Sequence, residues 1–166
     1  TRLCGGIPCA QERCSLAVGF PVHPMLANPS HSLEQVEQFV TAEDGRPLEA
    51  VAEWKYDGMR CQAHWDGSTT KLFSRHLLDT TEQYPDAVKY LSGAIQPGIE
   101  SFIVDAEIVG VVSTSESDSD SEFRLLPFQD LSTRRGTKQD TGRSVQIRIY
   151  AFDLLYLNGV SLIKQP

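Results

Sequence analysis

Two long apolar segments constrain the fold of this chain more than any other feature. Residues 101–112 and 145–157 are rich in β-branched and aromatic side chains, which predicts two long β-strands. Two shorter candidates, residues 60–65 and 71–74, flank Asp66-Gly67, a residue pair favoured in the tight turns of β-hairpins. We therefore expect an antiparallel sheet.

Helical spacing occurs in two other places. Ser32 is a candidate N-cap, and apolar residues recur behind it at helical spacing, which predicts a short amphipathic helix over 32–41. Pro85 in a first turn, followed by one apolar face, predicts a second helix over 85–95. Residues 51–54 form a short apolar run that we expect to be a further strand. Strands with interspersed helices and hairpins predict an α+β domain.

The chain is acidic, with a net charge of −7 from 22 acidic and 15 basic residues. This balance argues against a free-standing nucleic-acid binder, because phosphate contacts need Lys and Arg. Much of the excess lies in residues 113–122, which hold four acids and no base among serines. Because low complexity and high charge disfavour packing, we expect this run to be a disordered acidic insert.

Residues 1–30 are rich in Gly, Pro and Cys without a sustained period, and we interpret them as a connector from an upstream domain. Three of the four cysteines lie here, and a zinc site with His23 or His31 is conceivable, but no CxxC or HxxxH pair supports it. We expect free thiols. The chain starts without Met and ends directly after a strand-like segment, so we expect it to be part of a longer protein.

The sharpest chemical signal is the octet EWKYDGMR at residues 53–60. Lysine acts as a nucleophile through its neutral amine, which burial or a neighbouring cation favours. The Asp57-Gly58 pair bends the chain sharply, so Lys55 and Arg60 could converge on one phosphate-bearing ligand. On the octet alone, a surface hairpin with solvated Lys55 and Arg60 is an equal alternative.

Further segments follow the octet in a specific order. The octet resembles the KxDGxR motif of the covalent nucleotidyltransferases, which comprise DNA ligases, RNA ligases and mRNA capping enzymes. The whole set resembles the replicative, ATP-dependent DNA ligase I family of eukaryotes over residues 15–166. The matching segments are GFPVHPMLA at 19–27, FSRHLLDTT at 73–81, YPD at 84–86, FIVDAE at 102–107, LPFQDLSTRR at 126–135 and YAFDLLYLNG at 150–159.

The resemblance implies roles for three residues around the base and the α-phosphate. Lys55 attacks the α-phosphate of ATP and carries AMP through a phosphoramide bond while pyrophosphate leaves. Glu53 lies at the adenine edge, and Phe152 stacks on the adenine face. Without the family, Glu53 would be a solvent-facing acid and Phe152 a core residue.

The ribose, the phosphates and the metal involve other side chains. Arg60 and Glu107 match the pair that holds the ribose, and Arg75 matches an arginine that approaches the nucleotide phosphate; its alternative is a surface ion pair. Asp105 and Glu107 are two residues apart in the predicted 101–112 strand, so they project from one face, towards water or a polar ligand with Mg²⁺. The resemblance favours Glu107 near the metal and Asp105 in a structural role.

The resemblance also implies a domain organisation. The fold would be an ATP-grasp-like nucleotidyltransferase domain of the α+β class, with antiparallel sheets and flanking helices, incomplete at the C-terminus. Residues 1–30 would connect an upstream DNA-binding domain to residues 31–166, the N-terminal and central part of the adenylation domain. Because the family's later phosphate and metal motifs and its OB-fold domain lie beyond Pro166, we expect the isolated chain to be inactive.

For the full-length protein, the resemblance implies an ATP-dependent DNA ligase that works with Mg²⁺. It would pass AMP to the 5′-phosphate of a nick in double-stranded DNA and seal the nick through the 3′-hydroxyl. A nuclear location is implied, and so is a sliding-clamp partner bound through regions outside this chain. One alternative is an RNA ligase or a GTP-using capping enzyme, against which the PFQ and AFDLLYLNG elements argue. The other alternative is a non-catalytic scaffold that binds DNA or partners.

Overall fold

The computed structural model describes residues 15–113, 123–132 and 145–165. The chain divides into two compact units. We call Pro24–Lys55 the small unit, and Thr1–His23 with Tyr56–Pro166 the sheet unit. Most of the expected acidic insert and the three N-terminal cysteines lie outside the described residues.

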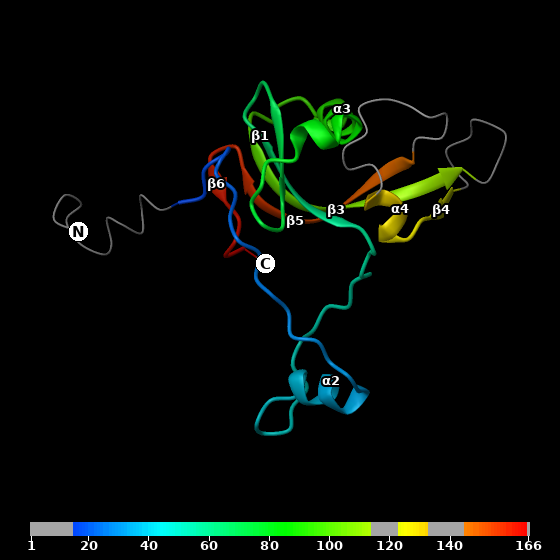
Figure 1. Cartoon of the computed structure of the whole chain (residues 1–166). Coiled ribbons are helices and arrows are strands. Elements are labelled where there is room, and N and C mark those ends of the chain that lie inside the picture. The colour runs from blue at the N-terminus through cyan, green and yellow to red at the C-terminus, as the bar shows by residue number, and fades with distance from the viewer. Residues whose placement is uncertain (1–14, 114–122, 133–144, 166) are drawn as a thin grey trace, which may run out of the picture. The chain divides into compact units, whose positions relative to one another are not determined.

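The described part of the sheet unit is built on one six-stranded sheet whose neighbouring strands are all antiparallel (Figure 1). The strand order is β2-β1-β3-β5-β6, and β4 pairs with β3. The two long strands predicted from the sequence are confirmed as β3 and β5. The strands are β1 (Met59–Trp65), β2 (Thr70–Ser74), β3 (Phe102–Ser113), β4 (Phe123–Leu125), β5 (Gln146–Leu157) and β6 (Val160–Ser161).

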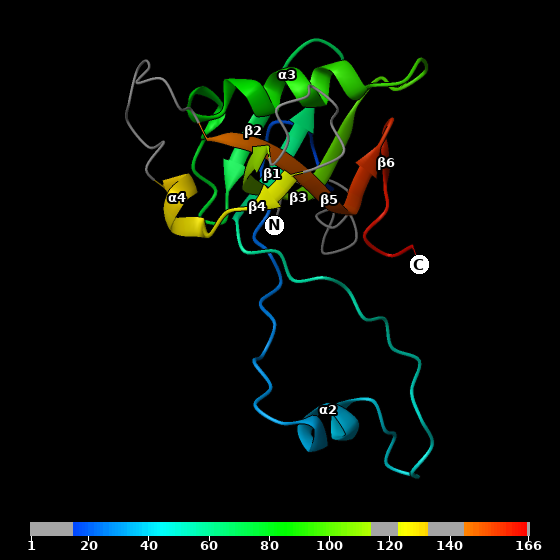
Figure 2. The ribbon, with the colours of Figure 1, turned by 90° about the vertical axis from the view of Figure 1, so that its right-hand side faces the viewer.

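One face of the sheet is covered by α3 (Pro85–Ala94), which runs across the strands (Figure 2). Pro85 opens this helix, as predicted, because proline needs no hydrogen-bond partner for its nitrogen in a first turn. A 3₁₀ turn, η1 (Thr81–Gln83), leads into it, and α4 (Phe128–Ser132) is a short helix after β4. None of the described helices is long and apolar enough to cross a bilayer.

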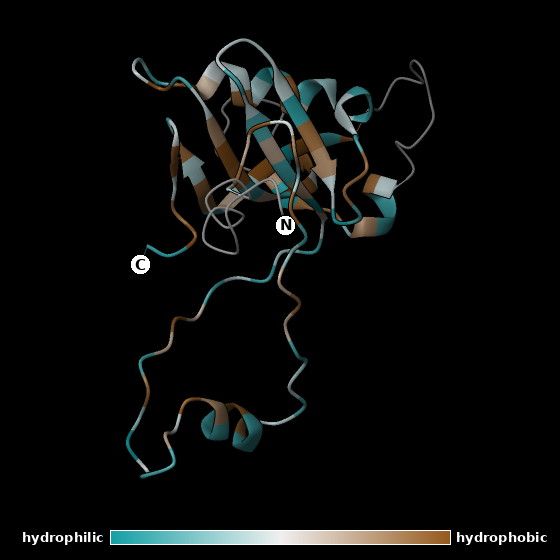
Figure 3. Ribbon diagram, turned by 90° about the vertical axis from the view of Figure 1, so that its left-hand side faces the viewer, coloured by the Kyte–Doolittle hydropathy of each residue, from teal (hydrophilic) through white to brown (hydrophobic). Residues whose placement is uncertain are grey.

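The core lies between α3 and the sheet. Alternate residues of β1 face it, namely Met59, Cys61 and Ala63, because side chains of a strand point to opposite faces in turn. The Tyr84 hydroxyl donates to the sulfur of Met59 at 3.3 Å, so the phenol is satisfied although the side chain is buried. Burial raises the pKa of the Cys61 thiol to about 12, which leaves it an inert core residue. In Figure 3 the strands carry both hydrophobic and hydrophilic segments, as expected when one face is apolar and the other polar.

The connection between β1 and β2 is longer than the two-residue turn that Asp66-Gly67 predicts. The strands stop pairing at Trp65 and Thr70, so four residues form the loop. The Asp66 carboxylate accepts hydrogen bonds from the backbone N–H groups of Ser68 and Thr69 at 2.9 and 2.8 Å, and from both hydroxyls. These four donors hold the pKa of Asp66 well below its usual range.

The small unit contains one helix, α2 (Leu33–Phe39), in the region predicted to be helical. Ser32 is its N-cap, because the Ser32 hydroxyl accepts from the Gln35 N–H at 3.3 Å. The predicted strand at 51–54 is wrong: these residues form neither helix nor strand, and Val51 and Trp54 are 84% and 87% exposed. A short, mostly apolar run becomes a strand when a neighbouring strand accepts its hydrogen bonds, and the described residues supply none here.

Candidate active site

Opposite the core, the central strands present a polar face. Arg60, Gln62 and His64 alternate with the core residues of β1 and therefore point to the other side of the sheet. On β3, the antiparallel register sets Glu107 opposite Arg60 and Asp105 opposite Gln62. Asp105 and Glu107 thus share one face, as their spacing predicted.

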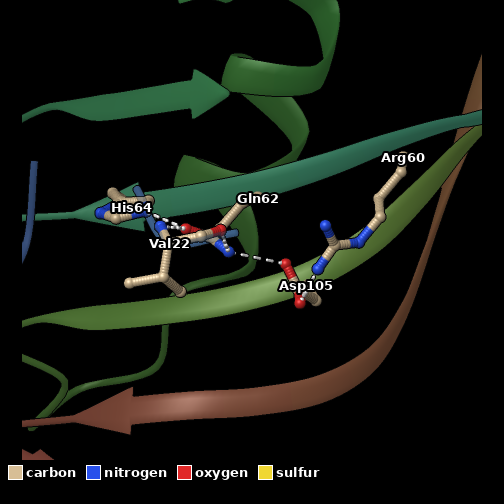
Figure 4. Close-up of polar contacts among 5 residues, drawn as sticks. All are labelled: Val22, Arg60, Gln62, His64 and Asp105. Atoms are coloured by element: carbon tan, nitrogen blue, oxygen red, sulfur yellow. Dashed lines mark hydrogen bonds and ion pairs between the residues drawn. The ribbon is translucent and has the colours of Figure 1, made fainter. Parts of the chain in front are cut away.

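The centre of this face is an ion pair between Arg60 and Asp105 (Figure 4). Arg60 Nη2 donates to Asp105 Oδ2, and Gln62 Nε2 donates to Asp105 Oδ1 at 3.1 Å. Asp105 is buried, and a buried carboxylate is costly unless both oxygens are satisfied. The arginine predicted to work with Glu107 is therefore held by Asp105, with Glu107 beside it in the register.

A segment far away in the sequence joins the same network. The Gly19 N–H donates to His64 Nδ1 at 2.9 Å, and the Val22 N–H donates to Gln62 Oε1 at 2.9 Å. Because Nδ1 of His64 accepts, its Nε2 carries the proton and donates to Gln62 Oε1 at 3.1 Å. Burial lowers the pKa of His64 to about 4, which agrees with a neutral ring.

Sequence reasoning missed Gln62 and His64. The available signal was that polar residues alternate with apolar ones through 60–65, which indicates a polar face. Their importance depends on which residues lie opposite them, and the register with β3 decides that.

The residues that directly follow Lys55 are anchored on the sheet unit. The ring of Tyr56 stacks on that of Tyr150 in β5, with centroids 4.0 Å apart and an interplanar angle of 17°. Asp57 Oδ2 accepts from the Phe128 N–H at 3.3 Å, at the start of α4. The two residues that follow Lys55 in the sequence are thus held by two separate elements of the sheet unit.

Gly58 completes this anchor because no other residue fits its place. A Cβ atom added there would lie 2.3 Å from the carbonyl oxygen of Ile108 and 2.9 Å from Cγ of Glu107. Real Cβ contacts are longer than this, and the carbonyl belongs to the backbone of the central strand β3, which cannot give way cheaply. The glycine of the KxDG pattern is therefore required by the close approach of the residue before β1 to strand β3, beside Glu107.

The other predicted residues are distributed as follows. Phe152 is the extra residue of a bulge in β5, since Ala151 pairs with Ala106 and Asp153 with Asp105. Its ring is 45% exposed, so it is not a core residue.

Three further predicted residues are exposed and have no contact with the Arg60–Asp105 pair among those described for the sheet unit. Arg75 is exposed in the turn that follows β2, where Leu77 adopts a positive φ of 62°. Glu53 and Lys55 are exposed residues of the small unit. The structure therefore brings together Arg60 and Glu107, and adds Asp105, Gln62 and His64 to them.

The family follows from comparison with known proteins. Residues 24–166 match the family described as ATP dependent DNA ligase domain. The chain belongs to this family, and the prediction drawn from its motifs is confirmed.

Several curated relatives share the family. DNA ligase 1 of Dictyostelium discoideum is 41% identical, with 97% of this chain and 13% of the relative covered. DNA ligase 1 of Drosophila melanogaster is 36% identical over 93% of the chain and 19% of the relative. DNA ligase 1 of Methanosarcina barkeri is 37% identical over 96% of the chain and 28% of the relative. The chain thus spans less than a third of these proteins.

Among solved structures, the chain is similar to the ligase domain of M. tuberculosis LigD. The TM-score is 0.48 and the identity 25%, over 68% of this chain and 31% of that one. A mycobacterial DNA ligase D complexed with ATP and MES gives a TM-score of 0.45 and an identity of 27%, with the same coverage.

Proposed function

We propose that this chain is the nucleotide-binding part of an ATP-dependent DNA ligase and that Lys55 takes up AMP. The observation that carries the proposal is the anchoring of Tyr56, Asp57 and Gly58 directly behind Lys55, next to the face that bears Arg60 and Glu107. A nucleophile has to be held within reach of its target for catalysis by proximity, and Lys55 directly precedes the three anchored residues in the sequence. Membership of the ATP-dependent DNA ligase domain family supports the same assignment.

The chemical step is a transfer of an adenylyl group. Nζ of Lys55, as a neutral amine, forms a bond to the α-phosphorus of ATP while the bond from that phosphorus to the bridging oxygen of pyrophosphate breaks. The amine loses a proton, and pyrophosphate leaves with the bonding electrons. The product is AMP linked to Lys55 through a phosphoramide bond.

Four other side chains hold the nucleotide in this proposal. Arg60 and Glu107 bind the ribose, and they lie opposite each other in the register of β1 and β3. Phe152 stacks on the adenine, which its exposure in the β5 bulge permits. Glu53 contacts the adenine edge.

The phosphates and the metal need further groups. Arg75 is the proposed contact to a nucleotide phosphate, and its exposure leaves it accessible. The described residues contain no cluster of three or more His, Cys, Asp or Glu that could hold a metal ion. Mg²⁺ fits nonetheless, because it binds through one or two carboxylates together with substrate phosphates and water. Glu107 is the proposed ligand, and Mg²⁺ would neutralise phosphate charge there.

In the full-length protein, AMP would pass from Lys55 to the 5′-phosphate of a nick in double-stranded DNA, and the 3′-hydroxyl would displace it. The proposal includes an upstream DNA-binding domain joined through residues 1–30, a nuclear location and a sliding-clamp partner. The net charge of −7 fits this arrangement if neighbouring domains supply the positive groove for DNA.

Labelling with radioactive nucleotide tests the proposal. The intact protein is incubated with Mg²⁺ and ATP labelled at the α-phosphate, and we expect an acid-labile label that Lys55→Ala abolishes. Lys89→Ala, at an exposed position of α3, is the matched control and should label like the wild type. Normal labelling of Lys55→Ala would refute the assignment of the nucleophile. A label obtained from GTP and not from ATP would instead support a capping enzyme.

A further inference from the structure

Gln62 is the one side chain in the described network that touches both the 19–22 segment and Asp105 (Figure 4). Its Oε1 accepts from Val22 N and from His64 Nε2, at 2.9 and 3.1 Å. Its Nε2 donates to the Val22 carbonyl and to Asp105 Oδ1, at 3.3 and 3.1 Å. The amide thereby uses both of its donors and both acceptor positions, and Gln62 is 2% exposed.

Such a complete set of contacts fixes the orientation of the amide. A flipped amide would set N–H groups against the Val22 N–H and oxygen against the Asp105 carboxylate, and both contacts would become repulsive. Nε2 of Gln62 therefore always faces Oδ1 of Asp105. With Gln62 Nε2 on Oδ1, the other oxygen of the carboxylate, Oδ2, accepts from Arg60 Nη2.

We infer that Gln62 is a positioning residue for Arg60, and that it ties the docked 19–22 segment to the orientation of the guanidinium. The inference rests on the proposed function, in which Arg60 binds the ribose. A guanidinium has five N–H donors in a planar fork, and a single carboxylate cannot accept from all of them. An arginine held at Nη2 therefore still presents donors to a ligand. The direction of these donors follows the plane that Asp105 imposes.

Removal of the amide should loosen this geometry without removing any group that touches the nucleotide. Gln62→Met keeps the length of the side chain and loses all four polar contacts. The Asp105 carboxylate then lacks one donor and can rotate, and Arg60 turns with it. The predicted defect is specific to recognition of the ribose.

Nucleotide preference gives the readout. In the intact protein, kcat/KM for formation of the Lys55–AMP bond is measured with ATP, 2′-deoxyATP and 3′-deoxyATP. We expect the wild type to prefer ATP over at least one deoxy analogue, and Arg60→Ala to lose that preference. Gln62→Met should reduce the preference about tenfold, the order expected for a lost hydrogen bond to a charged group. Gln83→Met, at an exposed position of η1, is the matched control and should keep the preference.

A purely structural role would lower the melting temperature and slow all three nucleotides equally. A folded Gln62→Met protein with wild-type preference would therefore overturn the inference. If the wild type forms no adduct, or Arg60→Ala keeps the preference, the proposed function fails and the inference falls with it. Loss of preference in Arg60→Ala but not in Gln62→Met rejects the inference alone.

Asp105→Asn provides a second route, which also serves if Gln62→Met does not fold. The asparagine oxygen can still accept from Gln62 Nε2, but the charge that holds Arg60 is gone. We expect the same loss of preference, and a double variant with Gln62→Met no worse than either single one, because both act on one path. An unchanged preference in Asp105→Asn, or fully additive effects, would contradict the inference.

Discussion

At the scale of single residues, a methyl group at position 58 would lie 2.3 Å from the carbonyl oxygen of Ile108. We predict that Gly58→Ala destabilises the chain by about 1–3 kcal/mol, the usual cost of overpacking. Gly93→Ala in α3 is the control, since nothing lies within 4 Å of the added Cβ and alanine favours a helix; it should stabilise by about 0.4–1 kcal/mol. Urea unfolding of both variants measures the difference. If Gly58→Ala and the wild type had equal free energies of unfolding, the chain could move away from β3 at this point at no cost.

Because Phe152 is partly exposed, a substitution there can affect ligand binding without affecting folding. Because its ring is 45% exposed, Phe152→Leu should change the melting temperature little. If the ring stacks on adenine, the substitution should weaken ATP binding by about 1–3 kcal/mol, as for base–aromatic stacks elsewhere. Tyr84→Leu is the contrasting variant, because Tyr84 is 1% exposed and should affect stability first. Calorimetric titration of the intact protein with ATP decides, and unchanged affinity of Phe152→Leu with a lowered melting temperature would reject the stack.

At the scale of elements, a buried histidine of β1, His64, makes the stability of the fold depend on pH. His64 has a pKa of about 4 in the folded chain because it is buried, against 6.5 for an exposed imidazole. The unfolded chain therefore binds a proton more readily, and the stability that His64 contributes is complete above about pH 6.5 and is lost as the pH falls towards 4.

We predict a loss of about 2 kcal/mol between pH 7 and pH 5 from this residue. Free energies of unfolding measured by urea denaturation at both pH values test it. His64→Gln should flatten the dependence, whereas His76→Gln, at an exposed position, should keep it. Identical slopes for the wild type and His64→Gln would show that another group is responsible.

At the scale of the whole molecule, the chain spans less than a third of its relatives DNA ligase 1 of Dictyostelium discoideum, Drosophila melanogaster and Methanosarcina barkeri. We predict that the isolated 166-residue chain forms little or no adduct with AMP, although it contains Lys55. Fixed cations must meet the charge that builds on the phosphates, and pyrophosphate must be held in line as it leaves.

Intact-mass measurement after incubation with ATP and Mg²⁺ checks this prediction, with the intact protein as the positive control. Stoichiometric modification of Lys55 at the rate of the intact protein would show that residues 1–166 suffice.

The sequence by itself determined the elements whose signals are local. The apolar content of 101–112 and 145–157 predicted β3 and β5, and the Asp66-Gly67 pair predicted β1 and β2 on either side of it. Helical spacing with Pro85 and Ser32 predicted α3 and α2. These signals depend on residues that are close in the sequence, so they can be recognised without knowledge of the fold. The octet around Lys55 and the ordered segments likewise predicted the family that the comparisons confirm.

Contacts between distant segments were decided by the tertiary structure alone. The run at 51–54 carries a local strand signal but pairs with none of the strands that the structure describes, and the partner of Arg60 is Asp105, 45 residues away. Gln62 and Val22 are 40 residues apart, and an ordinary polar residue in a strand gives no sign of such a partner. Register and docking set these contacts, because a hydrogen bond needs two groups within about 3 Å, and sequence distance says nothing about that.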